Sequence, residues 1–289
     1  MSRVEGRWAR GRRGPTRRII GRAAAGILAI AFACGAYLYL TLPDVRVLRT
    51  ENPEETAFMR IRADEARRRG EKPRRMYRWV GYGRISANLK RAVLVAEDAA
   101  FWTHTGIDIE QIKESMEINM ERMEFARGAS TITQQLAKNL YLSPSKNPIR
   151  KVRELLIARR LEVELTKPRI LELYLNVIEW GDGIYGAEAA SRTYFGKPAS
   201  ALGADESALL AAAIINPRVL NPGAPTARLR RRQQMILRRM GAVTPPANAA
   251  APSGPGALPA SEGVPAVLPG QALPPTTLPG APVKPPGGR

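Results

Sequence analysis

Apolar residues recur at intervals of three and four through most of residues 75–242, which is the spacing of helices that bury one face. Capping and turn residues divide this region into segments, and Ser86, for example, stands where an N-cap belongs. We expect helices over residues 87–97, 108–120, 130–140, 149–165, 168–180, 205–215 and 227–240. Because almost no segment alternates with the period of a strand, the pattern predicts a mainly α domain, with the alanine-rich helix at 205–215 buried.

A longer apolar run precedes this domain. Residues 23–42 are twenty consecutive uncharged residues, and twenty helical residues span about 30 Å, the thickness of the hydrocarbon layer. We therefore expect one transmembrane helix, with Tyr37 and Tyr39 in the interfacial zone. The alternatives are a signal peptide cleaved after Ala31-Phe32-Ala33 and a lipoprotein signal that ends at Cys34. The apolar run continues past both cleavage points, which favours a retained helix.

Charge indicates how this helix is oriented. Lys and Arg number 45 against 26 Asp and Glu, and the net charge of +19 favours an anionic partner such as a lipid surface, a phosphorylated substrate or nucleic acid. Eight arginines and one glutamate lie within residues 1–22, directly before the apolar run. Such flanks stay in the cytoplasm. We therefore expect residues 1–22 to be a basic cytoplasmic segment, with the domain on the other side of the membrane.

Two further segments carry no predicted chemistry. Residues 43–74 are highly charged and are interpreted as a membrane-proximal stalk, either a solvated linker or a helix against headgroups. Residues 243–289 are rich in Pro, Ala and Gly, which predicts a disordered tail. The only cysteine is Cys34, so an intramolecular disulfide and a cysteine metal cluster are excluded. The folded domain is therefore predicted over residues 75–242.

An acidic pair, Glu97-Asp98, stands where the first predicted helix of this domain ends. A carboxylate there can face a cleft, and the neighbouring Phe101 can exclude water and raise the pKa of that carboxylate. A solvated acidic pair is the plainer alternative. His104 is the only histidine, so we expect it to hold the loop by hydrogen bonds rather than to act in catalysis or in a multi-histidine metal site.

Neutral polar side chains crowd the start of the helix expected at 130–140. Beside free backbone N–H groups, such side chains predict a surface that binds sugar hydroxyls and phosphate. The candidate binding residues are Ser130, Thr131, Gln134, Gln135, Lys138 and Asn139. In the following helix Arg150 and Glu154 lie four residues apart on one face, which alone would indicate a surface ion pair.

These three clusters, in this order and at these spacings, resemble motifs of the family 51 glycosyltransferases, the peptidoglycan polymerases. Residues 167–176 and 183–197 resemble the family's fourth and fifth motifs. The form of residues 179–183, together with the absence of a large C-terminal domain, resembles the monofunctional members from Gram-negative bacteria. Two positions depart from the family pattern: Glu114 stands where many members carry a basic residue, and Ala129 replaces a glycine.

The resemblance implies a lysozyme-like helical glycosyltransferase domain. Such enzymes polymerise lipid II into β-1,4-linked glycan strands and release undecaprenyl diphosphate with inversion at the anomeric carbon. The residue matching their general base is Glu97, and Glu154 matches a second essential glutamate that either orients cations or binds a divalent ion such as Mg²⁺. No other cofactor is expected. The cations implied for the leaving diphosphate are Lys138, Lys146, Arg150 and Arg127.

The same resemblance implies the partners and the location. The expected partners are lipid II, the growing glycan strand and inner-membrane lipids, with cell-wall synthesis or division proteins as further candidates and no nucleic acid. The expected location is the cell inner membrane, as a single-pass protein with a cytoplasmic N-terminus and a periplasmic catalytic domain. The implied processes are cell-wall biogenesis and the maintenance of cell shape.

Three other functions compete with this interpretation. A glycan hydrolase could use two carboxylates in a similar cleft, but it would need no cations for a diphosphate. Ser143-Pro144-Ser145-Lys146 matches the S-x-x-K of transpeptidases, yet the S-D-N and K-T-G partners are missing. Nucleic-acid binding by the basic helix at 227–240 conflicts with the expected location. An amphipathic closing helix is the better interpretation, with inward residues Leu229, Met235, Ile236 and Met240.

Overall fold

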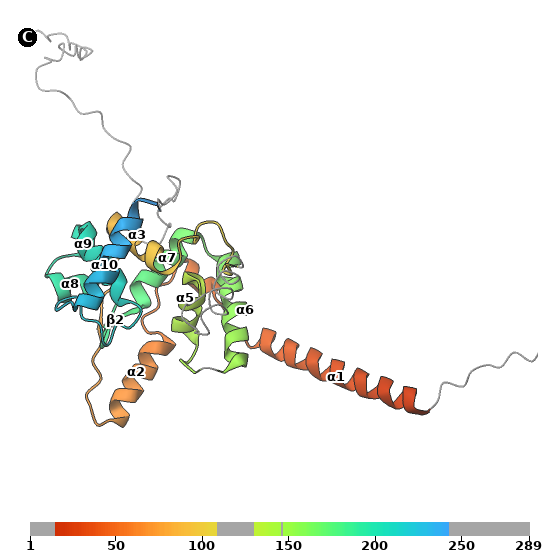
Figure 1. Ribbon diagram of the computed structural model, residues 1–289. Helices are drawn as coiled ribbons and strands as arrows, with labels where there is room; N and C mark the ends of the chain where they lie inside the picture. The colour runs from red at the N-terminus through yellow and green to blue at the C-terminus, as the bar shows by residue number, and fades with distance from the viewer. Residues whose placement is uncertain (1–14, 109–129, 146, 243–289) are drawn as a thin grey trace, which may run out of the picture. The chain divides into compact units, whose positions relative to one another are not determined.

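The computed structural model describes residues 15–108, 130–145 and 147–242 (Figure 1). The α-helices are α1 Pro15–Leu40, α2 Ala57–Arg68, α3 Ala87–Glu97, α5 Ile132–Tyr141, α6 Pro148–Glu164, α7 Lys167–Val177, α8 Ala187–Phe195, α9 Ala204–Ala213 and α10 Ala227–Arg239. Short 3-10 helices are η1 Arg46–Arg49, η2 Tyr82–Arg84, η3 Ala199–Ala201 and η4 Met240–Ala242, and the strands are β1 Met76–Tyr77, β2 Glu179–Gly181 and β3 Ile184–Tyr185. The expected mainly α character is confirmed. Most of the helix expected at 108–120, and the tail at 243–289, lie outside the described residues.

Side-chain caps explain why the helices begin where the sequence predicts. Oxygens of five side chains accept hydrogen bonds from N–H groups in the first turn of α3, α5, α6, α7 and α10. The capping residues are Ser86, Thr131, Asn147, Thr166 and Thr226.

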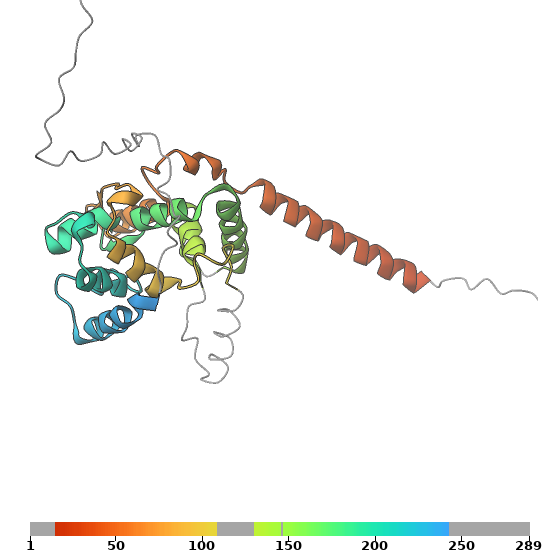
Figure 2. The same ribbon diagram turned by 90° about the horizontal axis from the view of Figure 1, so that it is seen from above.

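Helix α7 is the centre of the packing. Its residues 169–177 are all buried, and it packs against α5, α6 and α8 (Figures 1 and 2). Its polar side chains bind the segment that leads into α3. Glu172 accepts a hydrogen bond from Tyr82 N–H at 3.0 Å, and Asn176 accepts one from Val80 N–H and donates one to the Val80 carbonyl, each at 2.9 Å. These bonds hold the approach to α3 against the core.

A three-stranded sheet, in the order β1-β3-β2, was not expected from the sequence. β3 pairs in parallel with β1 and antiparallel with β2. Strands of two or three residues are too short to show a period. Glycines allow the close contacts here: a Cβ at Gly183, whose φ is +68°, would lie 2.5 Å from the Arg74 carbonyl oxygen.

The segment 43–74, predicted to be a stalk, is packed onto the domain. Val45 and Leu48 belong to the hydrophobic core, and α2 buries Met59. The guanidinium of the buried Arg169 donates to the Leu48 carbonyl at 2.8 Å. The folded part of the chain therefore begins near residue 42 rather than at 75.

Helices α3, α9 and α10 pack together, and α9 buries residues 207–213 as expected. The buried stripe of α10 is Leu229, Gln233 and Ile236, and it continues into Met240 at the start of η4. Met235, expected to face inward, is 41% exposed, because a position directly before Ile236 is turned about 100° away from it. This packing brings the arginine-rich α10 to α3.

Helix α1 is, among the described residues, the one helix long and apolar enough to cross a membrane, over Ile20–Leu40. This agrees with a single-pass membrane protein. The helix begins at Pro15 rather than 23 and ends at Leu40 rather than 42, and Leu42 is buried against the domain.

Candidate active site

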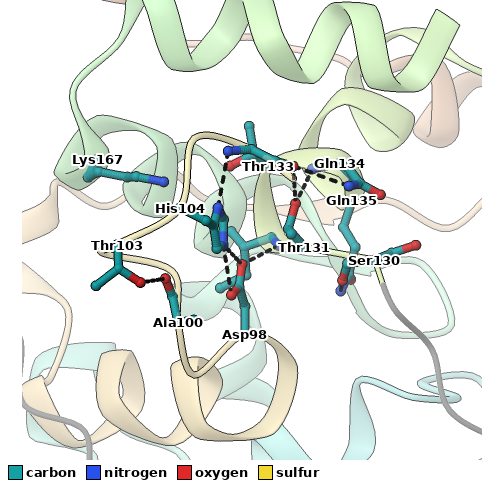
Figure 3. Close-up of polar contacts among 12 residues, drawn as sticks. Asp98, Ala100, Thr103, His104, Ser130, Thr131, Thr133, Gln134, Gln135 and Lys167 are labelled. Atoms are coloured by element: carbon teal, nitrogen blue, oxygen red, sulfur yellow. Dashed lines mark hydrogen bonds and ion pairs between the residues drawn. The ribbon is translucent and has the colours of Figure 1, made fainter. Parts of the chain in front are cut away.

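Two adjacent carboxylates at the end of α3 have different environments. Asp98 is buried and accepts hydrogen bonds from His104 Nε2 and from Ile132 N–H, each at 2.9 Å (Figure 3). Gly106 N–H donates to the other ring nitrogen, Nδ1, at 3.0 Å, so the proton of a neutral imidazole lies on Nε2. Asp98 therefore ties the end of α3 to the first turn of α5, and His104 holds the loop as expected.

The carbonyl of Gly106 is a second anchor for α5. It accepts hydrogen bonds from Thr131 Oγ1 at 2.7 Å and from Gln134 Nε2 at 3.1 Å. Both side chains are buried, so the structure engages these two predicted binding residues inside the protein. A role for them toward a sugar stays a prediction.

Glu97 has no such network. Among the described residues its Oε2 accepts one hydrogen bond, from Gln135 Nε2 at 2.9 Å, and the buried Tyr174 hydroxyl donates to Gln135 Oε1 at 2.9 Å. The side chain of Glu97 is 13% exposed. Burial raises the pKa of Glu97, and the hydrogen bond from Gln135 and the charges of Arg232 and Lys138 offset only part of this effect. A desolvated carboxylate with one neutral donor can accept a proton.

Glu154 is the centre of a second group, on α6. Its side chain is 4% exposed; Oε2 accepts from Arg150 Nη1, and Oε1 accepts from Lys151 Nζ. The Lys151 ammonium also donates to Ser130 Oγ at 3.2 Å and to Gln134 Oε1 at 3.0 Å. The predicted Arg150–Glu154 pair is therefore present, but its carboxylate is buried and shared with Lys151, while the two cations are partly exposed.

Lys138 connects the two groups. It lies on α5, three residues after Gln135, and makes no hydrogen bond or ion pair with the described residues. Burial lowers the pKa of Lys138, and both Glu154 and Glu97 act to raise it. The positive charges of Arg150 and Lys151 act in the opposite direction. The two groups meet at α5, because Gln135 donates to Glu97 and the preceding residue, Gln134, accepts from Lys151.

The other predicted residues fall into two sets. Asn139 is buried and donates to the Gln135 carbonyl at 2.8 Å, so its amide is engaged within α5. Lys146 and Arg127 lie outside the described residues, as do Glu114 and Ala129.

Sequence reasoning missed three residues of the site: Arg232, Tyr174 and Lys151. Arg232 Nη2 lies 3.8 Å from Glu97 Oε1, and its Nε is buried without a hydrogen bond to the described residues. Its neighbour Gln233 is on the buried stripe of α10, but no local pattern indicates that α10 packs on α3. Tyr174 lies within the fourth motif and Lys151 within the third, next to Arg150. Their membership of these motifs is the sequence signal that could have identified them as site residues.

The alternative of a divalent cation at Glu154 can be tested on the ligand set. Arg150 and Lys151 occupy one oxygen each of this carboxylate. In the described ranges no three His, Cys, Asp or Glu side chains gather as a metal site. The described residues around Glu154 therefore do not form a protein-only site for a divalent cation, and an ion bound together with the diphosphate stays a prediction.

The two adjacent carboxylates should differ in unfolding experiments. Asp98→Asn removes an acceptor from the bonds to His104 and Ile132, so we expect a loss of about 2–4 kcal/mol in the free energy of unfolding.

Because burial raises the pKa of Glu97, ionisation of this carboxyl costs more free energy in the folded state, and at pH 7 it lowers stability. Glu97→Gln should therefore be as stable as the wild type or more so. Denaturant unfolding measures both; a destabilised Glu97→Gln would contradict the assignment.

Comparison with known proteins identifies the family. The transglycosylase family matches residues 65–241, more than half of the chain. The biosynthetic peptidoglycan transglycosylases of Dechloromonas aromatica and Nitrosomonas eutropha are each 47% identical to it, over 68% and 66% of this chain and 84% and 79% of the relatives. That of Azoarcus sp. is 46% identical over 70% of this chain and 86% of the relative. The chain therefore belongs to the peptidoglycan transglycosylases, the glycosyltransferase family that its motifs resemble.

Proposed function

We propose that this transglycosylase polymerises lipid II into β-1,4-linked glycan strands and releases undecaprenyl diphosphate. The observation that best supports it is one site that combines the desolvated Glu97 with the cations around Glu154. A sugar hydroxyl needs a base to become a good nucleophile, and a diphosphate leaves more readily beside positive charge. Gln134 and Gln135, adjacent on α5, bind Lys151 and Glu97 respectively, which supports a single reaction centre.

In the proposed mechanism Glu97 takes the proton of the acceptor 4-hydroxyl. The oxygen forms a bond to the anomeric carbon of the donor while the bond from that carbon to the diphosphate oxygen breaks on the opposite face, which inverts the configuration. A raised pKa makes the carboxylate a stronger base, and the single hydrogen bond from Gln135 fixes its direction. The proton passes to solvent before the next cycle.

The leaving diphosphate carries away the electron pair, and cations stabilise the negative charge that develops on it. We assign this role to Lys138 and Arg150, with Lys146 and Arg127 as further contributors expected from the resemblance. Glu154 orients Arg150 and Lys151, because it binds both. This role needs no divalent ion held by the chain.

We further propose that the protein is anchored in the inner membrane by α1, with the arginines before it in the cytoplasm and the catalytic domain in the periplasm. Transpeptidase activity is not expected, since the S-D-N and K-T-G motifs are missing from the sequence. Lipid II, the glycan strand and membrane lipids are the proposed partners, with cell-wall synthesis or division proteins as further candidates.

Glu97→Gln should lower the rate of glycan formation from lipid II by about 10²–10⁴, because the amide keeps the shape and the bond to Gln135 but cannot accept a proton. The matched control is Glu71→Gln, at an exposed position, which should polymerise at the wild-type rate. A Glu97→Gln enzyme of near wild-type rate would remove the base from this residue. Cleavage of preformed glycan by the wild type, without polymerisation of lipid II, would instead identify a hydrolase.

Lys138→Met keeps the apolar stem of the side chain and removes its charge. We expect turnover to fall by about 10²–10³, while the free energy of unfolding changes by less than about 1 kcal/mol, since no described residue loses a partner. Steady-state kinetics and unfolding on the same preparation measure both, with the exposed Lys72→Met as control. Unchanged turnover would exclude Lys138 from the diphosphate site, and unfolding would assign it to the fold.

A further inference from the structure

A basic cavity lies where the chain leaves α1. It measures about 500 Å³, and its walls are the end of α1, the approach to η1 and the second half of α6. Its α6 residues, which include Arg159, Arg160 and Val163, lie on the face opposite to Glu154, as the helical period requires. This basic cavity is therefore separate from the candidate active site.

The charges of the basic cavity do not cancel. Asp44 forms an ion pair with Arg46 through hydrogen bonds of 2.8–3.2 Å, and Glu164 forms one with Arg49, which does not line the cavity. Arg159 and Arg160 have no ion pair with the described residues. Arg159 is exposed and has no hydrogen bond with them either. Arg160 donates to the Tyr39 carbonyl and lies over the Tyr39 ring, and its charge helps to lower the pKa of Asp44 without forming an ion pair with it.

Arginines of α6 bind the segment at the end of the apolar helix α1, next to the cavity. Arg160 donates to the Tyr39 carbonyl at 3.3 Å and lies 4.5 Å over the Tyr39 ring, and Arg153 donates to the hydroxyl and the carbonyl of Thr41, each at 2.9 Å. In both views the end of α1 lies beside α6 (Figures 1 and 2). The apolar run ends at Leu40, so with α1 across a bilayer the cavity is at the depth of the lipid phosphates.

We propose that the basic cavity binds the phosphate headgroup of an anionic phospholipid, with Arg159 and Arg160 as its ligands. A guanidinium binds phosphate through paired N–H donors. The lining holds three arginines against two carboxylates, and this net positive charge favours an anionic over a zwitterionic headgroup. Val163, 66% exposed beside them, suits contact with the acyl chains. The proposal rests on the membrane anchoring by α1, but not on the chemistry assigned to Glu97.

The test uses the full chain in phosphatidylcholine vesicles that carry a small fraction of a photoactivatable lipid, either phosphatidylglycerol or phosphatidylcholine. Cross-linked peptides are quantified by mass spectrometry. We expect the peptides of η1 and α6 to be labelled at least about fivefold more by phosphatidylglycerol, the preference that one arginine near an anionic surface provides. In Arg159→Gln/Arg160→Gln the ratio should fall to near one. The control Arg228→Gln/Arg230→Gln, which removes the same charge from the exposed face of α10, should keep the wild-type ratio.

Several outcomes would overturn the proposal. If wild-type protein floats with the vesicles but is labelled equally by the two lipids, the headgroup site is excluded and the membrane anchoring stands. If the protein does not float, both the anchoring by α1 and the headgroup site are excluded. Displacement of the label by millimolar inorganic phosphate would assign the cavity to a free anion, and displacement by lipid II would assign it to the substrate. If the double variant misfolds, the single variant Arg159→Gln is used instead, because this exposed side chain has no partner among the described residues to lose. An unchanged ratio of phosphatidylglycerol to phosphatidylcholine labelling in Arg159→Gln would exclude Arg159 as a ligand.

Discussion

The buried carboxylate of Asp98 is the constraint on which the rest of the site depends. A carboxylate away from water is stable only when its oxygens are hydrogen bonded, and here the donors are the imidazole of His104 and the Ile132 N–H in the first turn of α5. These bonds fix the end of one helix against the start of another. Glu97, the residue before Asp98 and the last of α3, is thereby held beside Gln135, and α5 also carries Lys138, which is near the cations around Glu154.

The two glutamates of the site differ because of their neighbours rather than their burial. Glu154 has a cation on each oxygen, so its charge is compensated and its geometry fixed. Glu97 has one amide donor, with Arg232 at 3.8 Å, and burial raises its pKa. A carboxylate in this environment lowers the stability of the folded protein and is a stronger base than an exposed one. This is expected of a residue that is kept for function rather than for folding. This contrast supports Glu97 as the base and Glu154 as the residue that orients cations.

Local signals in the sequence predicted most of the fold and part of the site. Caps such as Ser86 and Thr131 act within one turn, so the helix starts could be predicted. Glu97, Lys138 and Glu154 lie on α3, α5 and α6, the helices expected for them, while their roles stay predictions. What depends on distant packing could not be predicted. The segment 43–74 looks solvated by composition, yet Arg169 on α7 binds its backbone. Arg232 reaches Glu97 only because α10 packs on α3, a contact between residues far apart in the chain.

Glu97 is a desolvated carboxylate, and the charge of Arg232 moderates its basicity. The most direct test is the titration of this carboxyl by carbon-detected NMR of protein labelled at glutamate, with Glu97→Gln used to assign the resonance. We expect the pKa of Glu97 to lie above that of exposed glutamates. In Arg232→Gln it should be higher still, because a positive charge that favours the ionised form is removed. A Glu97 that titrates with the exposed glutamates, or whose pKa is unchanged in Arg232→Gln, would contradict this expectation.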